Sequence, residues 1–255
     1  GEPWIPGSVV SLLQPRLVQG GGEVADLPGA GMRVLLVEDH EVNRVLISMQ
    51  LSQLGARVLS AANGRLALDI LQSESVDLVL TDLQMPVMDG AELCRQLRAS
   101  ARWQQLPVYV ITADLSEQAA QRLADCGCQG HLDKPVLLKE LAILLRTVSG
   151  RSSVPLAEEA AVNATPMTTL LNPALINLYL VSARQDLADI EGCVTTGDEG
   201  ALNTALHKMK GAAKMVGAAA LVQVIERWQR APGQPLVEEL KQAVEEVCRQ
   251  LGERA

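Results

Sequence analysis

The chain has 255 residues, of which 48% are hydrophobic and 20% charged, enough apolar material for about two modest domains and too much for a disordered chain. Its formal net charge of −8 and its aromatic content of 2% exclude the basic surface and the stacking platform that nucleic-acid binding requires. No apolar stretch approaches the ~18 residues of a membrane span. The five cysteines form no CxxC pair, which favours free thiols in a reducing compartment. We therefore expect a cytoplasmic location, no direct membrane contact in this segment and no nucleic-acid partner.

Residues 32–148 alternate short apolar runs with segments of helical periodicity. The runs expected as strands are Val34–Val37, Val58–Leu59, Leu78–Leu80, Val108–Ile111 and Gly130–Leu132. The segments expected as helices lie near 43–54, 64–72, 90–99, 116–126 and 137–148. This alternation predicts an α/β domain with a doubly wound, five-stranded parallel sheet. In such a sheet, ligands gather at the carboxyl ends of the strands.

The composition changes on both sides of this domain. Residues 1–31 contain four prolines and a run of three glycines, so we expect a connector that holds at most one short strand, Ser8–Leu13. Residues 149–170 are rich in Ser, Ala, Thr and Pro, which is typical of a linker. Residues 171–255 show no strand pattern, and glycines and prolines separate amphipathic segments. We expect four or five helices there, packed as an all-α bundle.

Three carboxylates follow the first and third predicted strands. Glu38 and Asp39 come directly after the first strand and Asp82 directly after the third, so a parallel sheet brings them together at one edge. Such charges repel unless a hard cation lies between them, and Mg²⁺ binds carboxylates together with waters and phosphate oxygens. Thr112 and Lys134 end the fourth and fifth strands. An acceptor carboxylate, a metal pair, a hydroxyl and a lysine at one edge suit phosphoryl transfer.

Four motifs through these residues resemble response-regulator receiver domains. They are V-L-L-V-E-D-H at 34–40, T-D-L-Q-M-P-V-M-D-G at 81–90, I-T-A at 111–113 and L-D-K-P at 132–135. The resemblance implies that Asp82 is the phosphoacceptor and that Thr112 and Lys134 bind the phosphoryl oxygens. It implies that Mg²⁺ is held by Glu38, Asp39, Asp82 and the backbone carbonyl of Gln84. It also implies a cis peptide bond between Lys134 and Pro135.

The resemblance further implies a switch formed by Thr112 and residue 131. The family usually carries Tyr or Phe at that place, whereas this sequence has His131. Taken alone, an acidic pair after a strand is more often a solvated loop or a helix cap, and His40 is more often a helix-start residue than a ligand. The phosphoacceptor interpretation is nevertheless favoured, because acidic residues, a threonine and a lysine all lie at the ends of successive predicted strands.

A histidine lies in the amphipathic segment from Asp198 to Val216, which we expect to be one helix. At about 100° per residue, His207 falls about 140° from the apolar centre of this helix, Lys210 about 80°, Lys214 about 120° and Gly211 about 180°. His207 is therefore expected on the solvent face, where a surface histidine beside lysines is the ordinary interpretation.

The string H-K-M-K-G-A-A-K-M-V-G at 207–217 resembles the H-x-x-K-G pattern of histidine-phosphotransfer (Hpt) domains. By this resemblance His207 is the relay residue. Lys210, Gly211 and Lys214 would form a docking face, because a bare glycine admits another protein's active-site edge and lysines offset phosphoryl charge.

A receiver followed by an Hpt bundle resembles the C-terminal part of unorthodox hybrid sensor histidine kinases. This implies a relay from a kinase histidine to Asp82, then to His207, and then to a separate response regulator. The implied partners are a sensor kinase core, in the same full-length chain, and a downstream receiver domain. The implied location is the cytoplasmic part of a bacterial inner-membrane sensor. Residues 6–12 faintly resemble the last strand of such a kinase's ATP-binding domain, so residues 1–31 are either its remnant or a plain tether.

Other functional classes stay open. The sequence has no H-E-x-x-x-P motif and no Gly-rich ATP lid, so whether the chain by itself is an enzyme is not decided. A phosphorylation-independent docking scaffold with a receiver fold would have no need of the complete set of charges. An aspartyl-phosphate hydrolase would carry D-x-D after the first strand, where this sequence has Glu38-Asp39-His40.

Overall fold

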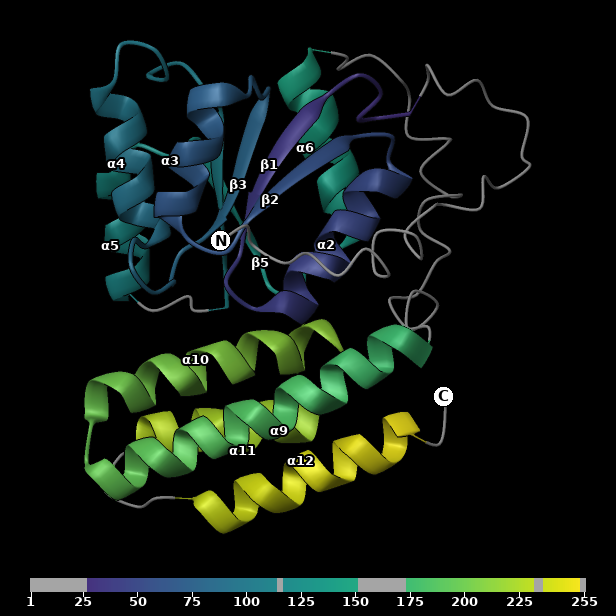
Figure 1. The fold of residues 1–255 in the computed structure, drawn as a ribbon, viewed down its shortest axis with the longest axis vertical. Coiled ribbons are helices and arrows are strands. Elements are labelled where there is room, and N and C mark those ends of the chain that lie inside the picture. The colour runs from purple at the N-terminus through teal and green to yellow at the C-terminus, as the bar shows by residue number, and fades with distance from the viewer. Residues whose placement is uncertain (1–26, 114–116, 151–172, 232–235, 253–255) are drawn as a thin grey trace, which may run out of the picture.

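The structure is a computed structural model that describes residues 27–113, 117–150, 173–231 and 236–252. The strand expected at Ser8–Leu13 and most of the expected linker lie outside these ranges. The described residues form an α/β domain and a helical bundle, drawn one above the other in Figure 1.

Five parallel strands form one sheet in the order β2-β1-β3-β4-β5. They are β1 (Arg33–Val37), β2 (Arg57–Ala61), β3 (Leu78–Asp82), β4 (Val108–Thr112) and β5 (Gly130–Asp133). The doubly wound, five-stranded sheet predicted from the sequence is confirmed. Every residue of β3 is buried because helices cover both faces of the sheet, and this explains its unbroken apolar run.

Helices cover each face of the sheet (Figure 1). Buried side chains form a separate core on each of these faces. The core that contains Val34 and Leu36 is covered by α2 (Glu41–Gln53) and α6 (Leu138–Ser149). The core that contains Leu35 and Val37 is covered by α3 (Gly64–Ser73), α4 (Gly90–Ala99) and α5 (Glu117–Cys126). Alternate residues of β1 therefore enter opposite cores, as the pleat of a strand requires.

The second domain holds four helices among the described residues, in agreement with the four or five expected. They are α9 (Pro173–Thr196), α10 (Glu199–Met215), α11 (Ala219–Arg230) and α12 (Val237–Gly252). The helix predicted over Asp198–Val216 is α10. The Asp198 side chain caps it by accepting a hydrogen bond from the backbone N–H of Ala201 at 2.9 Å. Gly217 follows the helix in the left-handed conformation, with φ at 74°.

The bundle packs against the end of the sheet at which β1 leads into α2 (Figure 1). Helices α9 and α10 make this contact, and both touch α2. Buried apolar side chains form one continuous cluster from the α2 side of the sheet into the bundle. The two domains are therefore docked, which the sequence left undecided. No described helix combines the length and the apolar composition that crossing a membrane requires.

Candidate functional site

Three acidic side chains meet where β1 and β3 end. Carboxylate oxygens of Glu38, Asp39 and Asp82 lie within 4.8 Å of one another. Glu38 and Asp82 are buried, and Asp39 is half-buried. The three carboxylates therefore lie together, as predicted from their positions after the first and third strands. We call this group the carboxylate cluster.

The ammonium of Lys134 lies between two of these carboxylates. Its Nζ is 2.5 Å from Oδ2 of Asp82 and 2.7 Å from Oε2 of Glu38. Burial alone would lower the pKa of Lys134, but the carboxylates of Asp82 and Glu38 raise it above its ordinary value. Lys134 therefore stays charged beside Asp82. Its peptide bond to Pro135 is cis, as predicted.

The acidic groups carry more negative charge than one ammonium can neutralise. Burial raises the pKa of Glu38 to about 7, while Lys134 acts to lower it and the Asp82 carboxylate to raise it. Burial and the charge of Asp82 raise the pKa of Asp39 as well. A divalent cation with hard oxygen ligands would relieve this repulsion. The donor set therefore fits Mg²⁺.

The other residues predicted for the first domain lie around the carboxylate cluster. Thr112 is fully buried at the end of β4, and its carbonyl accepts a hydrogen bond from the backbone N–H of Lys134 at 2.8 Å. The backbone N–H of Gln84 donates to Oδ1 of Asp82 at 3.2 Å, so the loop after β3 folds over the carboxylate. The side chain of His131 is 48% exposed, with its Nε2 4.0 Å from Oδ1 of Asp133. The switch between Thr112 and His131 stays a prediction.

His207 does not lie on a solvent face, so that prediction from the helical wheel is wrong. Only 7% of the residue is exposed, and Gly211 is buried too. A Cβ on Gly211 would lie 3.4 Å from Nζ of Lys134 and 3.5 Å from Nδ2 of Asn43. Residues four apart share one face of a helix, so His207 and Gly211 both face the first domain. The wheel describes a helix relative to its own bundle and cannot show that a second domain covers the opposite side.

The two lysines predicted to flank His207 point in different directions. Nζ of Lys214 donates to the backbone carbonyl of Ala113, in the first domain, at 2.8 Å. Nζ of Lys210 lies 3.2 Å from Oε1 of Glu226 on α11. The contact found for Lys214 therefore crosses between the domains, whereas the ion pair of Lys210 lies within the bundle.

Known families match both domains. Residues 34–146 match the response regulator receiver domain, and residues 174–250 match the Hpt domain. The chain is a receiver domain followed by an Hpt domain. This pair gives it a role in a two-component phosphorelay.

Curated proteins similar to the chain include three sensor proteins. The sensor histidine kinase GacS of Pseudomonas protegens is 28% identical over 237 residues, which cover 85% of this chain and 26% of GacS. The sensory/regulatory protein RpfC of Xanthomonas campestris is 30% identical over 209 residues, covering 74% of this chain and 29% of RpfC. The virulence sensor protein BvgS of Bordetella pertussis is 29% identical over 232 residues, covering 81% and 19%. The chain thus spans less than a third of the length of these relatives.

Solved receiver domains are also similar to the first domain. One is the receiver domain of the sensor histidine kinase PA1611 from Pseudomonas aeruginosa, which is described with a magnesium ion coordinated in its active site cleft. It is 32% identical to this chain, with a TM-score of 0.45, and the match covers 48% of this chain and 99% of that one. The receiver domain of a histidine kinase from Syntrophus aciditrophicus is 29% identical, with a TM-score of 0.45, covering 49% and 98%.

One polar contact between the receiver and the Hpt domain was not predicted from the sequence. Nε2 of His40 lies 3.0 Å from Oδ2 of Asp186 and 3.1 Å from Oγ of Ser182. Nζ of Lys208 lies 3.2 Å from Oδ1 of Asp186. His40 is the N-cap residue of α2, as expected, but its side chain makes no capping bond. The available signal was Asp186, an acidic residue on the otherwise apolar buried stripe of α9, where a carboxylate needs a partner.

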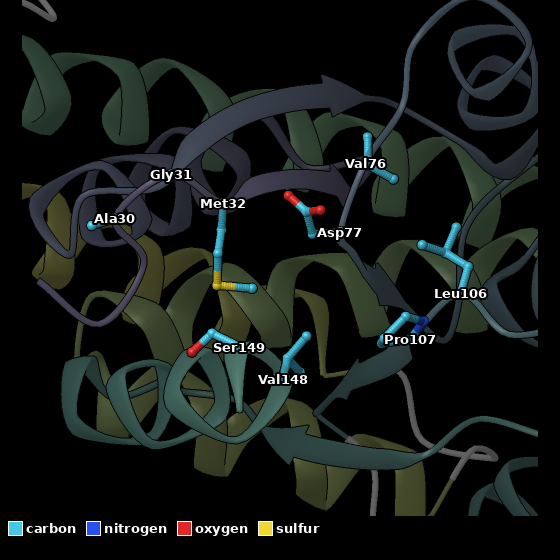
Figure 2. Close-up of a pocket in the computed structure, with 9 residues that line it drawn as sticks. All are labelled: Ala30, Gly31, Met32, Val76, Asp77, Leu106, Pro107, Val148 and Ser149. Carbon is cyan, nitrogen blue, oxygen red and sulfur yellow. The ribbon is translucent and has the colours of Figure 1, made fainter. Parts of the chain in front are cut away.

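A cavity of about 520 Å³ lies at the opposite end of the sheet (Figure 2). It is lined by residues that precede β1, β3 and β4 and by the end of α6, namely Ala30, Gly31, Met32, Val76, Asp77, Leu106, Pro107, Val148 and Ser149. Its acidic side chain is already engaged, because Oδ2 of Asp77 accepts a hydrogen bond from the backbone N–H of Arg33 at 2.7 Å. Ligands of parallel sheets bind at the other end, so we assign this cavity no role in phosphotransfer.

Proposed function

We propose that the chain is a phosphorelay intermediate in which Asp82 accepts a phosphoryl group from a kinase histidine and passes it to His207. One observation carries the proposal. Gly211, one helical turn from His207, lies against Lys134, whose ammonium is 2.5 Å from Asp82. This arrangement supports direct transfer, because an acceptor and a donor held in one buried space need no further encounter.

In the first step, a carboxylate oxygen of Asp82 attacks the phosphorus atom of the kinase phosphohistidine. A P–O bond forms to Asp82, the P–N bond breaks, and the kinase imidazole leaves. Lys134 and the hydroxyl of Thr112 would bind phosphoryl oxygens, and Lys134 also neutralises charge on the acceptor. The residues that would hold Mg²⁺ are Glu38, Asp39, Asp82 and the backbone carbonyl of Gln84. When bound, Mg²⁺ supplies positive charge beside the phosphoryl oxygens.

In the second step, a ring nitrogen of His207 attacks the phosphorus atom of the acyl phosphate on Asp82. A P–N bond forms to His207, the P–O bond breaks, and the Asp82 carboxylate leaves beside the ammonium of Lys134. The attack requires a neutral imidazole with an available lone pair. The burial of His207 supports this step, because excluding water limits hydrolysis of the phosphoryl group.

The proposal extends to the partners and the location of the chain. His207 would donate the phosphoryl group to the receiver domain of a separate response regulator. A sensor kinase core would supply it, as the names of the similar sensor kinases suggest, from the cytoplasmic side of a bacterial inner membrane. The division into residues 1–31, 32–148, 149–170 and 171–255 is supported by the matched ranges 34–146 and 174–250.

Labelling with acetyl phosphate and Mg²⁺ tests the proposed function. The chain should first gain base-labile phosphate, which is characteristic of aspartate, and later acid-labile phosphate, which is characteristic of histidine. The variant His207→Gln should keep only the base-labile form. A chain that takes up neither form would instead be a phosphorylation-independent scaffold.

A further inference from the structure

Two polar contacts between the described parts of the receiver and the Hpt domain differ in kind. Lys214 donates to a backbone carbonyl, that of Ala113. Any receiver offers a carbonyl at this place, so this bond does not distinguish one receiver from another. The contact between His40 and Asp186 joins two side chains. It depends on which residues occupy both positions, and it can therefore carry specificity.

The pair of His40 and Asp186 is deeply buried, with side chains 1% and 2% exposed. The Asp186 carboxylate also pairs with the ammonium of Lys208 at 3.2 Å, so we assign it as the acceptor and Nε2 of His40 as the donor in their 3.0 Å contact. An apolar residue in place of His40 would remove a donor from a buried carboxylate. Such a loss weakens an interface strongly, because the carboxylate gives up water without full compensation.

A downstream receiver has to use the same face of the Hpt domain. His207 is only 7% exposed while the chain's own receiver covers it. Another receiver can reach His207 only after this one has moved away, and it then meets Asp186 at the place that His40 held. The chain's own receiver therefore shows what an accepted receiver presents to Asp186.

We propose that Asp186, beside Ser182 and Lys208, is a specificity-determining residue of the Hpt face. The downstream receiver that this face accepts would carry a side-chain hydrogen-bond donor at the position of His40, directly after its acidic pair. This inference rests on the proposed function and adds the chemistry of the partner to it.

The test places the donor and the acceptor on separate full-length chains. Every donor chain carries His207→Gln together with Asp186→Ala, and every acceptor chain carries Asp82→Asn together with His40→Leu. The pair of positions 40 and 186 is then already broken within each chain. Changes to residue 40 of the donor or residue 186 of the acceptor therefore act on the contact between the chains.

Donor chains are labelled with acetyl phosphate and Mg²⁺, and the initial rate of His207 labelling on the acceptor is measured. We expect a donor with His40→Leu, or an acceptor with Asp186→Ala, to lower the rate at least about tenfold. Both changes together should lower it no more than either alone, because both remove the same contact. A donor with His40→Gln keeps an N–H near the position of Nε2 and should transfer within about threefold of the His40 donor.

Two controls separate the possible failures. All donors must take up equal phosphate on Asp82, which shows that changes at residue 40 leave the neighbouring acidic pair intact. Transfer that is equally fast with His40→Leu, or losses that multiply in the double change, would overturn the role of Asp186 and leave the proposed function standing. If the donor with His40 fails to label an acceptor with Asp186, this face does not accept a receiver from another chain, and the inference is wrong. The proposed function fails only if the unchanged chain also gains no acid-labile phosphate.

Discussion

The carboxylate cluster around Asp82 and the face around His207 are two halves of one site that are built in different ways. The first half is assembled within the receiver, where Lys134 holds Asp82 and Glu38 at 2.5 and 2.7 Å. The second half is a helix surface against which the receiver packs, with Gly211 close to Lys134 and His207 only 7% exposed. The contacts of Lys214 and Asp186 both cross between the domains. The receiver half can therefore form in any arrangement of the domains, whereas His207 becomes a buried acceptor only in the docked one.

The substitution Asp82→Asn should break both halves of the relay at once. It removes the nucleophilic carboxylate, so we expect complete loss of phosphate from the receiver and from His207 when a phosphorylated kinase is the source. Chelation of divalent metal with EDTA should give the same loss, reversed by added Mg²⁺, because the ammonium of Lys134 alone cannot neutralise the three carboxylates and the phosphoryl group. Labelling of His207 that persists in the Asp82→Asn chain would contradict the order of transfer.

The substitution Gly211→Val should break the docked half alone. An alanine Cβ would rest at an ordinary contact distance of 3.4 Å from Nζ of Lys134, but the added methyl groups of valine would push the helix away. We expect the transfer rate from Asp82 to His207 to fall about a hundredfold with valine, because small displacements of reacting groups cost that much. Gly211→Ala, the matched control, should stay within about threefold of the natural chain.

Labelling of Asp82 by acetyl phosphate and the helical circular dichroism should be unchanged in both Gly211 variants. Normal transfer in a folded Gly211→Val chain would show that this face does not receive the phosphoryl group.

The substitution Gly90→Ala tests how tightly the receiver half is packed. A Cβ at this position would lie 2.1 Å from the backbone carbonyl oxygen of Asp82, so the strand end that carries the acceptor has to shift. We expect the free energy of unfolding to fall by about 1–3 kcal/mol in urea titrations. Gly192→Ala, on an exposed part of α9 with open space around it, should instead gain ~0.5–1 kcal/mol. Equal effects of the two changes would mean that the loop after β3 yields easily.

The substitution Val87→Gly should have the smallest effect. Val87 lies in the loop beyond the acceptor with φ at 70°, a conformation that disfavours a β-branched residue, and it is 84% exposed. Glycine relieves the strain without losing packing, so we expect stability to rise by about 1 kcal/mol. Val181→Gly, at an exposed helical position, should lower it by a few tenths of a kcal/mol. Thermal unfolding of both variants would show opposite signs, and a loss of stability in both would contradict strain at Val87.

The fold and the receiver half of the site could be predicted from the sequence. Glu38, Asp82, Thr112 and Lys134 each end or follow a short apolar run, and a parallel sheet places all such positions at one edge. The alternation of short apolar runs with amphipathic segments was enough to predict the parallel sheet and the helices that cover it. The order of strands and polar residues along the chain was therefore enough to predict the receiver half of the site.

The docked half could not be predicted in the same way. His40 and Asp186 are 146 residues apart in the chain and belong to different domains, so no periodicity relates them. The helical wheel correctly placed His207 away from the apolar face of its own helix, but it predicted that the side chain is exposed to solvent. Only the packing of one domain on the other shows that the side opposite the bundle core is itself covered.

The dependence of His207 labelling on chain concentration tests most directly whether Asp82 and His207 of the same chain react with each other. The chain is labelled on Asp82 by a short pulse of acetyl phosphate and Mg²⁺, diluted over a hundredfold range of concentration, and followed by the appearance of acid-labile phosphate. Transfer within a docked chain is first order, so its rate constant should be the same at every dilution. A rate constant that falls in proportion to the concentration would show that Asp82 reaches His207 only on another molecule, and would contradict the account.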